Sequence, residues 1–145
     1  MNERIIYSTA DNGIVILIPA PECGLTIQEM AAKDVPAGTA FEIVDVSVIP
    51  SDRIFRGAWE KQANTVNVNM PKARDIKRNM IRAERAIELA RLDVEFMRAL
   101  ENGNVGEQNR IKAEKQRHRD APANPKIEQS VTPDALKALT LADLI

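Results

Sequence analysis

The residues whose side chains could carry out chemistry are few in this 145-residue chain, and they stand apart from one another. His118 is the only histidine. A metal ligand or general base needs a second group that converges on it, and the sequence places none beside His118, so we expect a solvated surface histidine. Cys23 is the only cysteine. A helix that begins soon after it could activate the thiol, but no histidine adjoins it, and we expect a buried or inert thiol. The sequence therefore predicts no catalytic residue, no metal ligand and no cofactor site, and hence no enzyme.

Two sets of basic residues could bind an anion. Arg53 and Arg56 could clamp a carboxylate, or they could be ordinary surface residues. The segment 72–85 carries six Lys/Arg, enough to contact phosphates. However, Asp75 and Glu84 interrupt it, the aromatic content is only 3% and the pI is about 5.9. We therefore expect a solvated or protein-facing surface and no nucleic-acid partner.

Composition and charge indicate the kind of core the chain has and the partners it lacks. Hydrophobic residues make up 44% of the chain but aromatic residues only 3%, so its core must be aliphatic and rich in alanine. Residues 1–70 carry five Lys/Arg against nine Asp/Glu, whereas residues 71–120 carry thirteen against nine. A single cysteine is typical of a reducing interior. The longest apolar run, 14–19, is too short to span a bilayer, and we expect no membrane partner.

The first half of the chain has the pattern of a small β structure. Asp11-Asn12-Gly13 predicts a hairpin turn between strands at 4–9 and 13–18, because Asn-Gly tolerates the positive φ of a tight primed turn. Thr26 and Glu29 have the spacing of a capping box for a short helix that ends near Lys33. Alternating residues predict further strands at 41–48, with Val44, Val46 and Val48 on one face, and at 65–70.

Phe55 and Trp59 are the one cluster of large aromatic residues. They stand four residues apart in Arg53-Ile54-Phe55-Arg56-Gly57-Ala58-Trp59. Such a pair could be a ligand platform, but a hydrophobic plug that packs this segment onto a sheet is the favoured interpretation.

The second half is dominated by a long helix that Asn69 should cap, with Pro71 in its first turn. Its apolar residues recur at alternating steps of three and four, a heptad period typical of a coiled coil. We call this row the seam: Ala73, Ile76, Met80, Ala83, Ile87, Ala90, Val94 and Met97. The opposite face is basic in the first half of the helix and carries a second apolar stripe in the second half, Leu89, Leu92 and Phe96. Asp93 could interrupt the helix.

Two arrangements could cover the seam. It could pack within its own domain, or it could bind another chain. The following helix, 105–119, offers only three apolar residues, too few to cover the seam and the second stripe together. The β-rich half, a second copy of the chain or a partner must therefore cover the rest, and this shortage strengthens the case for another chain. The hypothesised interface consists of Ala73, Ile76, Met80, Ala83 and Ile87.

The predicted fold class is therefore α+β. A small antiparallel β-rich half spans residues 1–70, and the long helix forms a helical hairpin over 71–120. A linker and a short C-terminal helix that Thr132 opens occupy 121–145.

Four segments of the chain resemble small tail-module proteins of tailed bacteriophages and prophages, described as tail assembly chaperones or tail-fibre assembly-like proteins. The segments are 52–59, 68–76, 81–85 and 92–101. The resemblance implies a non-catalytic protein without a cofactor. Such a protein chaperones or joins a tail or tail-fibre component in the host cytoplasm, with a homo-oligomer as a further possibility. The alternatives are a structural virion subunit at the baseplate or fibre attachment, and a phage effector that binds a host protein.

Overall fold

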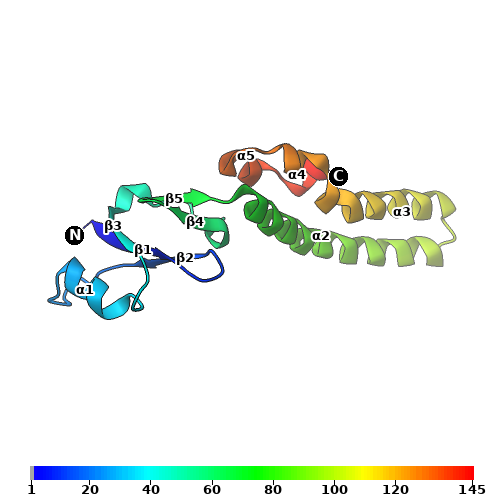
Figure 1. Ribbon diagram of the computed structural model, residues 1–145. Coiled ribbons are helices and arrows are strands. Elements are labelled where there is room, and N and C mark those ends of the chain that lie inside the picture. Colours follow the sequence, from blue (N-terminus) through cyan, green and yellow to red (C-terminus); the bar gives the residue numbers. More distant parts are fainter. Residues whose placement is uncertain (1) are drawn as a thin grey trace. The chain divides into compact units, whose positions relative to one another are not determined.

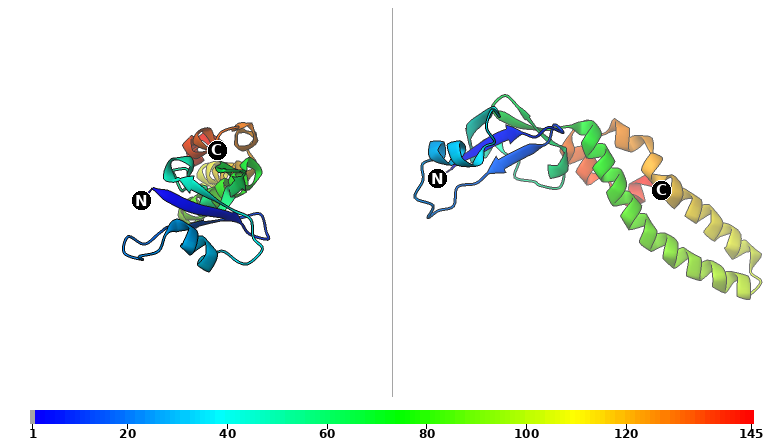
Figure 2. Two further views of the ribbon diagram at one scale, coloured as in Figure 1. Left: turned by 60° about the vertical axis from the view of Figure 1, so that its left-hand side comes forward. Right: turned by 60° about the horizontal axis from the view of Figure 1, so that its bottom comes forward.

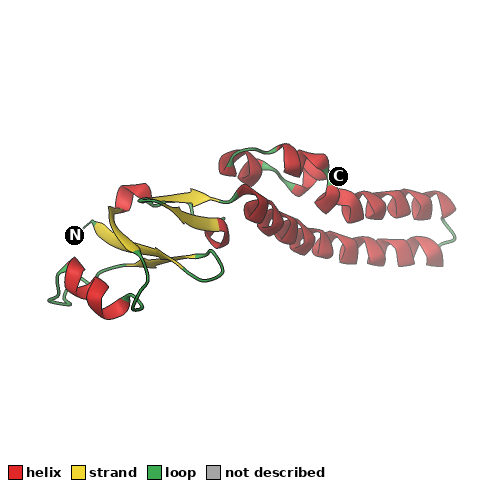
Figure 3. Ribbon diagram, in the orientation of Figure 1, coloured by secondary structure: helices red, strands yellow, loops and turns green. Residues whose placement is uncertain are grey.

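The computed structural model describes residues 2–145 and confirms the predicted α+β class. The chain divides into two compact units, Met1–Lys72 and Ala73–Ile145. Strands lie in the first unit and the long helices in the second (Figure 3).

A three-stranded antiparallel sheet forms one part of the first unit. Its central strand β1 (Glu3–Ser8) pairs with β2 (Ile14–Leu17) on one side and β3 (Phe41–Asp45) on the other. A hairpin joins β1 and β2 as predicted, but its turn is not the tight primed turn: Asn12 has φ 59° while Gly13 does not have a positive φ, and residues 9–13 form a longer loop in which the Asn12 amide donates to the Thr9 carbonyl at 3.1 Å.

The short helix α1 (Ile27–Asp34) begins with the predicted capping box. Thr26 Oγ1 accepts a hydrogen bond from the Glu29 amide at 3.2 Å, and the Glu29 carboxylate accepts one from the Thr26 amide at 2.8 Å. Ile27 and Met30 of this helix pack with Ile5 of the sheet.

The strand predicted at 41–48 is shorter than expected. The Asp45 carboxylate accepts a hydrogen bond from the Ser47 amide at 2.9 Å, which ends β3 and turns the chain into the 3₁₀ helix η1 (Val46–Val48). Val44, Val46 and Val48 therefore do not share one face of a strand: Val44 is buried and Val46 is 39% exposed.

A second ribbon completes the first unit. After the 3₁₀ turn η2 (Arg56–Ala58), the strand β4 (Trp59–Gln62) pairs with the strand β5 (Thr65–Val68). The sequence pattern predicts only β5 of these two strands.

Helix α2 (Met70–Glu101) begins where the sequence predicted, because Asn69 Oδ1 accepts a hydrogen bond from the Lys72 amide at 3.0 Å. It runs without a break past Asp93. Gly103 (φ 66°) ends it, and the Asn104 amide donates to the Ala99 carbonyl at 2.9 Å. Helix α3 (Val105–Asp120) then returns alongside the second half of α2, as Figures 1 and 2 show.

The C-terminal part folds into more helices than the one predicted. These are η3 (Ala121–Ala123), α4 (Pro125–Gln129), α5 (Pro133–Ala138) and α6 (Leu141–Leu144). They lie beside the first half of α2 (Figure 1), where Arg74 Nη2 donates to the Ser130 carbonyl at 3.1 Å. Among residues 2–145, no helix is both long enough and apolar enough to cross a membrane.

Candidate functional site

The seam is divided into a covered part and an exposed part. Ala73 is fully buried, and Ile76 and Met80 are half-buried. Ala83 and Ile87 are exposed, and 72% of the surface of Ile87 is open to solvent. The five residues of the hypothesised interface therefore do not form one continuous free surface.

The exposed part continues along the second half of α2. We call it the exposed stripe: Ala83, Ile87, Ala90, Val94 and Met97. Val94 is 53% exposed and Met97 is 52% exposed. At a rise of about 1.5 Å per residue, the stripe is roughly 20 Å long. A row of apolar side chains of this length on one helix face is typical of a surface that binds another helix.

Helix α3 covers the second apolar stripe of α2 and leaves the seam open. Leu92 and Ala99 are buried with Ile111 of α3, and Phe96 packs against this cluster. Ile111 is the one large apolar residue that α3 buries. A helix with so little apolar surface can cover only one stripe, so the seam remains without a cover in the second half of α2.

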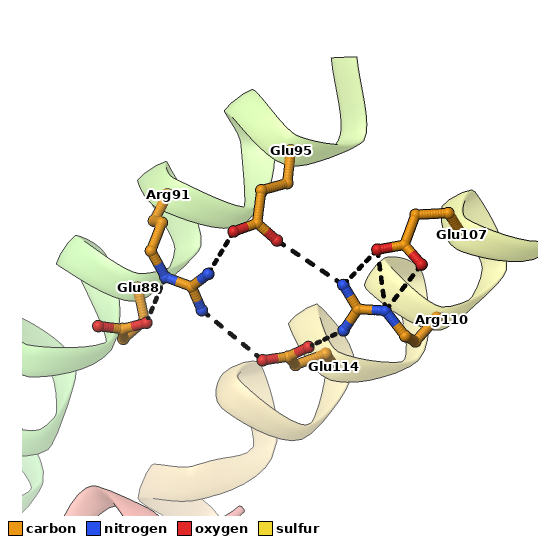
Figure 4. Close-up of polar contacts among 6 residues, drawn as sticks. All are labelled: Glu88, Arg91, Glu95, Glu107, Arg110 and Glu114. Atoms are coloured by element: carbon orange, nitrogen blue, oxygen red, sulfur yellow. Dashed lines mark hydrogen bonds and ion pairs between the residues drawn. The ribbon is translucent and has the colours of Figure 1, made fainter. Parts of the chain in front are cut away.

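Ion pairs supply much of the remaining contact between α2 and α3. Figure 4 shows two arginines among four glutamates: Arg91 and Arg110 with Glu88, Glu95, Glu107 and Glu114. Arg91 of α2 reaches Glu114 of α3 at 3.8 Å, and Arg110 of α3 reaches Glu95 of α2 at 3.7 Å. The hydrogen bonds from Arg110 hold the pKa of Glu107 below its ordinary value. Within this network, only the two contacts at 3.8 and 3.7 Å join α2 to α3, and the other pairs lie within one helix.

Lys77, which the sequence reasoning placed on the basic outer face, is buried in the first half of α2. Its side chain is only 5% exposed, and Nζ donates to the Lys137 carbonyl of α5 at 3.3 Å. Burial lowers the pKa of this ammonium group. The C-terminal helices cause this burial, and no local pattern in the sequence indicates that they lie beside α2.

The other basic residues line an open hollow of about 390 Å³. Its arginines are Arg78, Arg82 and Arg85 of α2 and Arg119 of α3, beside Pro122 and Ala123. Arg78 is paired with Asp75 at 2.8 Å and with Glu128. The other three arginines have no carboxylate partner among residues 2–145. Guanidinium groups in such a hollow can bind an anion. Sequence reasoning missed Arg119, because only the return of α3 brings it near α2.

The expectation of a solvated histidine is not met, and Cys23 is not buried, which leaves an inert thiol as the prediction for it. His118 is 3% exposed and therefore buried, and its Nδ1 has no hydrogen-bond partner among the described residues. The prediction of a solvated histidine is wrong, because the chain folds back over the end of α3. Cys23 is exposed, with its Sγ 3.7 Å from the Leu25 carbonyl. In the part of the chain from 2 to 145, no group of three or more His, Cys, Asp and Glu residues could hold a metal ion.

Phe55 and Trp59 lie in the interior of the first unit, each 2% exposed. Trp59 belongs to a cluster with Ile6, Val44 and Val66. The indole is therefore not an open stacking platform. Arg53 and Arg56, by contrast, are exposed and lie beside a small hollow that Trp59 helps to line.

Comparisons with known proteins give no relative: no family model, curated protein or solved structure matches the chain.

Proposed function

We propose that this chain is a non-catalytic assembly protein that binds a helix of a partner protein through the exposed stripe of α2. One observation carries the proposal. Ile87, Val94 and Met97 are 72%, 53% and 52% exposed on the face of α2 that faces away from α3. Leaving such a row in water forfeits roughly 1.5–3 kcal/mol for each large apolar side chain that a partner could bury.

The heptad spacing of the stripe indicates what kind of partner fits. Side chains at steps of four and three present a straight row to a second helix that has the same period, and each side chain can insert between four residues of the facing helix. The small residues Ala83 and Ala90 alternate with the larger Ile87, Val94 and Met97, so a partner helix could approach closely at two levels.

The biological setting of the proposal comes from the sequence resemblance alone. Within it, the partner is a tail or tail-fibre protein of a tailed bacteriophage, and this chain chaperones or joins that component during assembly. The chain could then leave before the particle is complete or remain in the virion. Its absence from purified particles would support the first role and its presence the second.

A pair of matched variants tests the proposed surface. Ile87→Asp places a charge in the middle of the exposed stripe. Val131→Asp is the control: Val131 is 74% exposed, also apolar, and lies outside the stripe between α4 and α5. Because both sites are exposed, we expect each variant to keep the helical circular dichroism of the wild type and a free energy of unfolding within about 0.5 kcal/mol of it.

The binding measurement is co-purification of each variant with co-expressed phage tail and tail-fibre proteins. We expect Ile87→Asp to lose the partner and Val131→Asp to keep it. Equal co-purification of both variants would contradict the proposal. Sedimentation of the chain alone tests whether the exposed stripe instead binds a second copy of this chain. A wild-type dimer that Ile87→Asp converts to a monomer, with no tail protein captured, would assign the stripe to a second copy instead of a tail protein.

A further inference from the structure

One edge of the exposed stripe of α2 carries a row of charged residues. Glu84, Arg91 and Arg98 recur every seven residues, and each directly follows a residue of the stripe, so the three lie along the same edge of the helix. Arg91 is neutralised within α2, by Glu88 at 2.9 Å and by Glu95 (Figure 4). Glu84 and Arg98 are exposed and make no ion pair among residues 2–145. This edge therefore has an unpaired acid at one end and an unpaired base at the other.

The opposite edge of the stripe is apolar at its ends. Ala86, Asp93 and Leu100 recur along it with the same spacing. Ala86 is exposed, and Leu100 is 50% exposed. Asp93, between them, is paired with Lys115 of α3. On both edges, therefore, the charge in the middle already has a partner, whereas the groups at the ends have none.

A second copy of α2, antiparallel to the first, would supply the missing partners. In a symmetric antiparallel pair of heptad helices, each edge meets the same edge of the other copy in reversed order. Glu84 then faces Arg98 of the second copy, and Arg98 faces its Glu84, which gives two pairs of opposite charge. On the other edge, Leu100 faces Ala86 twice.

The centre of this pair brings like charges together, but these charges are already compensated. Arg91 faces its own counterpart on one edge, and Asp93 faces its own counterpart on the other. The glutamates beside Arg91 and the ammonium group of Lys115 beside Asp93 reduce both repulsions.

The same register interleaves the apolar side chains of the stripe. Ile87 lies opposite Met97 of the second copy, and Ala90 lies opposite its Val94. The smaller side chain of Ala90 leaves room for the larger one that faces it. The pairing also removes from water the large side chains that the stripe exposes, Ile87, Val94 and Met97.

We propose that the free chain forms a dimer through the exposed stripe, with the two α2 helices antiparallel and Glu84 opposite Arg98. Sliding the second copy by one heptad in either direction would leave Arg98 without an acid, so the charges select this register. The inference rests on the proposed function, because both use the same stripe: the second copy covers it until a helix of a tail protein takes its place.

Exchange of the two charges tests the register. Arg98→Glu sets an acid against an acid at both ends of the dimer, and Glu84→Arg sets a base against a base. Each variant should weaken dimerisation by about tenfold. The double variant Glu84→Arg with Arg98→Glu restores opposite charges and should dimerise as the wild type does. Lys33→Glu makes the same change of charge on α1, outside the stripe, and should have no effect.

Sedimentation equilibrium of the purified full-length variants measures the dimerisation. Because the exchanged positions are exposed, we expect every variant to keep the helical circular dichroism of the wild type. A wild-type chain that stays monomeric at about 1 mM would overturn the proposal. A double variant as weak as Arg98→Glu would also overturn it, because a parallel second copy sets Arg98 against Asp93 instead. Single variants that dimerise as the wild type does would show that the two charges do not meet.

A second readout separates this inference from the proposed function. The purified chain alone reports on the dimer, and co-purification with co-expressed tail and tail-fibre proteins reports on the partner. A wild-type monomer that captures a tail protein would overturn the dimer and leave the proposed function intact. A dimer with the expected charge dependence that captures no tail protein would support the dimer and contradict the proposed function.

Discussion

Several polar side chains of this protein are buried without good partners. Among residues 2–145, Lys77 makes one long hydrogen bond at 3.3 Å, and the Nδ1 of His118 and the Nε1 of Trp59 make none. Each such group loses its hydration on folding and recovers little of it. At the residue scale, these positions are therefore those where a change of side chain can raise the stability of the fold.

Lys77→Met tests this at the most buried charge. The substitution removes an ammonium group that is only 5% exposed and keeps a flexible apolar chain of similar length. Replacing a buried charge by a well-packed apolar side chain is often neutral or stabilising by about 1–4 kcal/mol. We expect the free energy of unfolding in urea to stay equal or rise at neutral pH.

The pH dependence supplies a control for the same site. Burial lowers the pKa of Lys77 below its ordinary value of 10.5. The unfolded chain then binds more protons than the folded chain between the two pKa values, so wild-type stability should rise with pH in that window. Lys77→Met should lack this rise. A variant that loses more than about 1 kcal/mol at neutral pH would show that the ammonium group stabilises the fold.

At the scale of elements, the pairing of α2 with α3 depends on few apolar contacts and many charges. Leu92, Ala99 and Ile111 form the buried cluster, and the six-residue network of Figure 4 has two contacts that join the same two helices. Exposed ion pairs contribute little singly and more in a network of good geometry. The hairpin should therefore be more sensitive to charge than the first unit is.

Acid should destabilise α3, which carries both Arg110 and Glu107. Because Arg110 holds the pKa of Glu107 below its ordinary value of 4.5, the contribution of this pair is present above that pH and is lost as the pH falls through the folded-state pKa. We expect the midpoint of thermal unfolding, followed by the helical circular dichroism, to fall in this acidic window. Arg110→Gln should lower the midpoint at neutral pH and reduce its acid dependence. A variant with the acid dependence of the wild type would assign that dependence to other carboxylates.

At the scale of the whole molecule, the two compact units have separate cores and separate reporters. Trp59, the only tryptophan, reports on the unit Met1–Lys72, and most of the helical signal comes from Ala73–Ile145. Units with cores of their own need not unfold together.

Ile111→Ala tests this independence. Ile111 is fully buried, and removing such a side chain typically costs about 2–5 kcal/mol. We expect the substitution to lower the midpoint of the unfolding transition followed by circular dichroism. The transition followed by tryptophan fluorescence should not change. Val105→Ala, at a position that is 63% exposed, should change neither transition. A shift of both transitions by Ile111→Ala would show that the two units unfold as one.

Features that depend on neighbouring residues could be predicted from the sequence. The positive φ of Asn12, the Thr26–Glu29 capping box and the Asn69 cap are all present, because each is a hydrogen bond or a backbone conformation within a few residues, although the turn at Asn12 is longer than predicted. The heptad period of the seam likewise follows from spacing along one helix.

What the sequence could not decide is which surfaces become covered, because that depends on segments far along the chain. Helix α2 has two apolar stripes, and only the tertiary structure places Ile111 against Leu92 and leaves Ile87 in water. His118 carries no local signal of burial, and the C-terminal helices that bury Lys77 are separated from it by the whole of α3. Arg4 and Arg53 likewise meet at one hollow only after the strands pair. Local patterns determine the elements of this protein, while the competition among elements for a limited apolar surface determines its free surfaces.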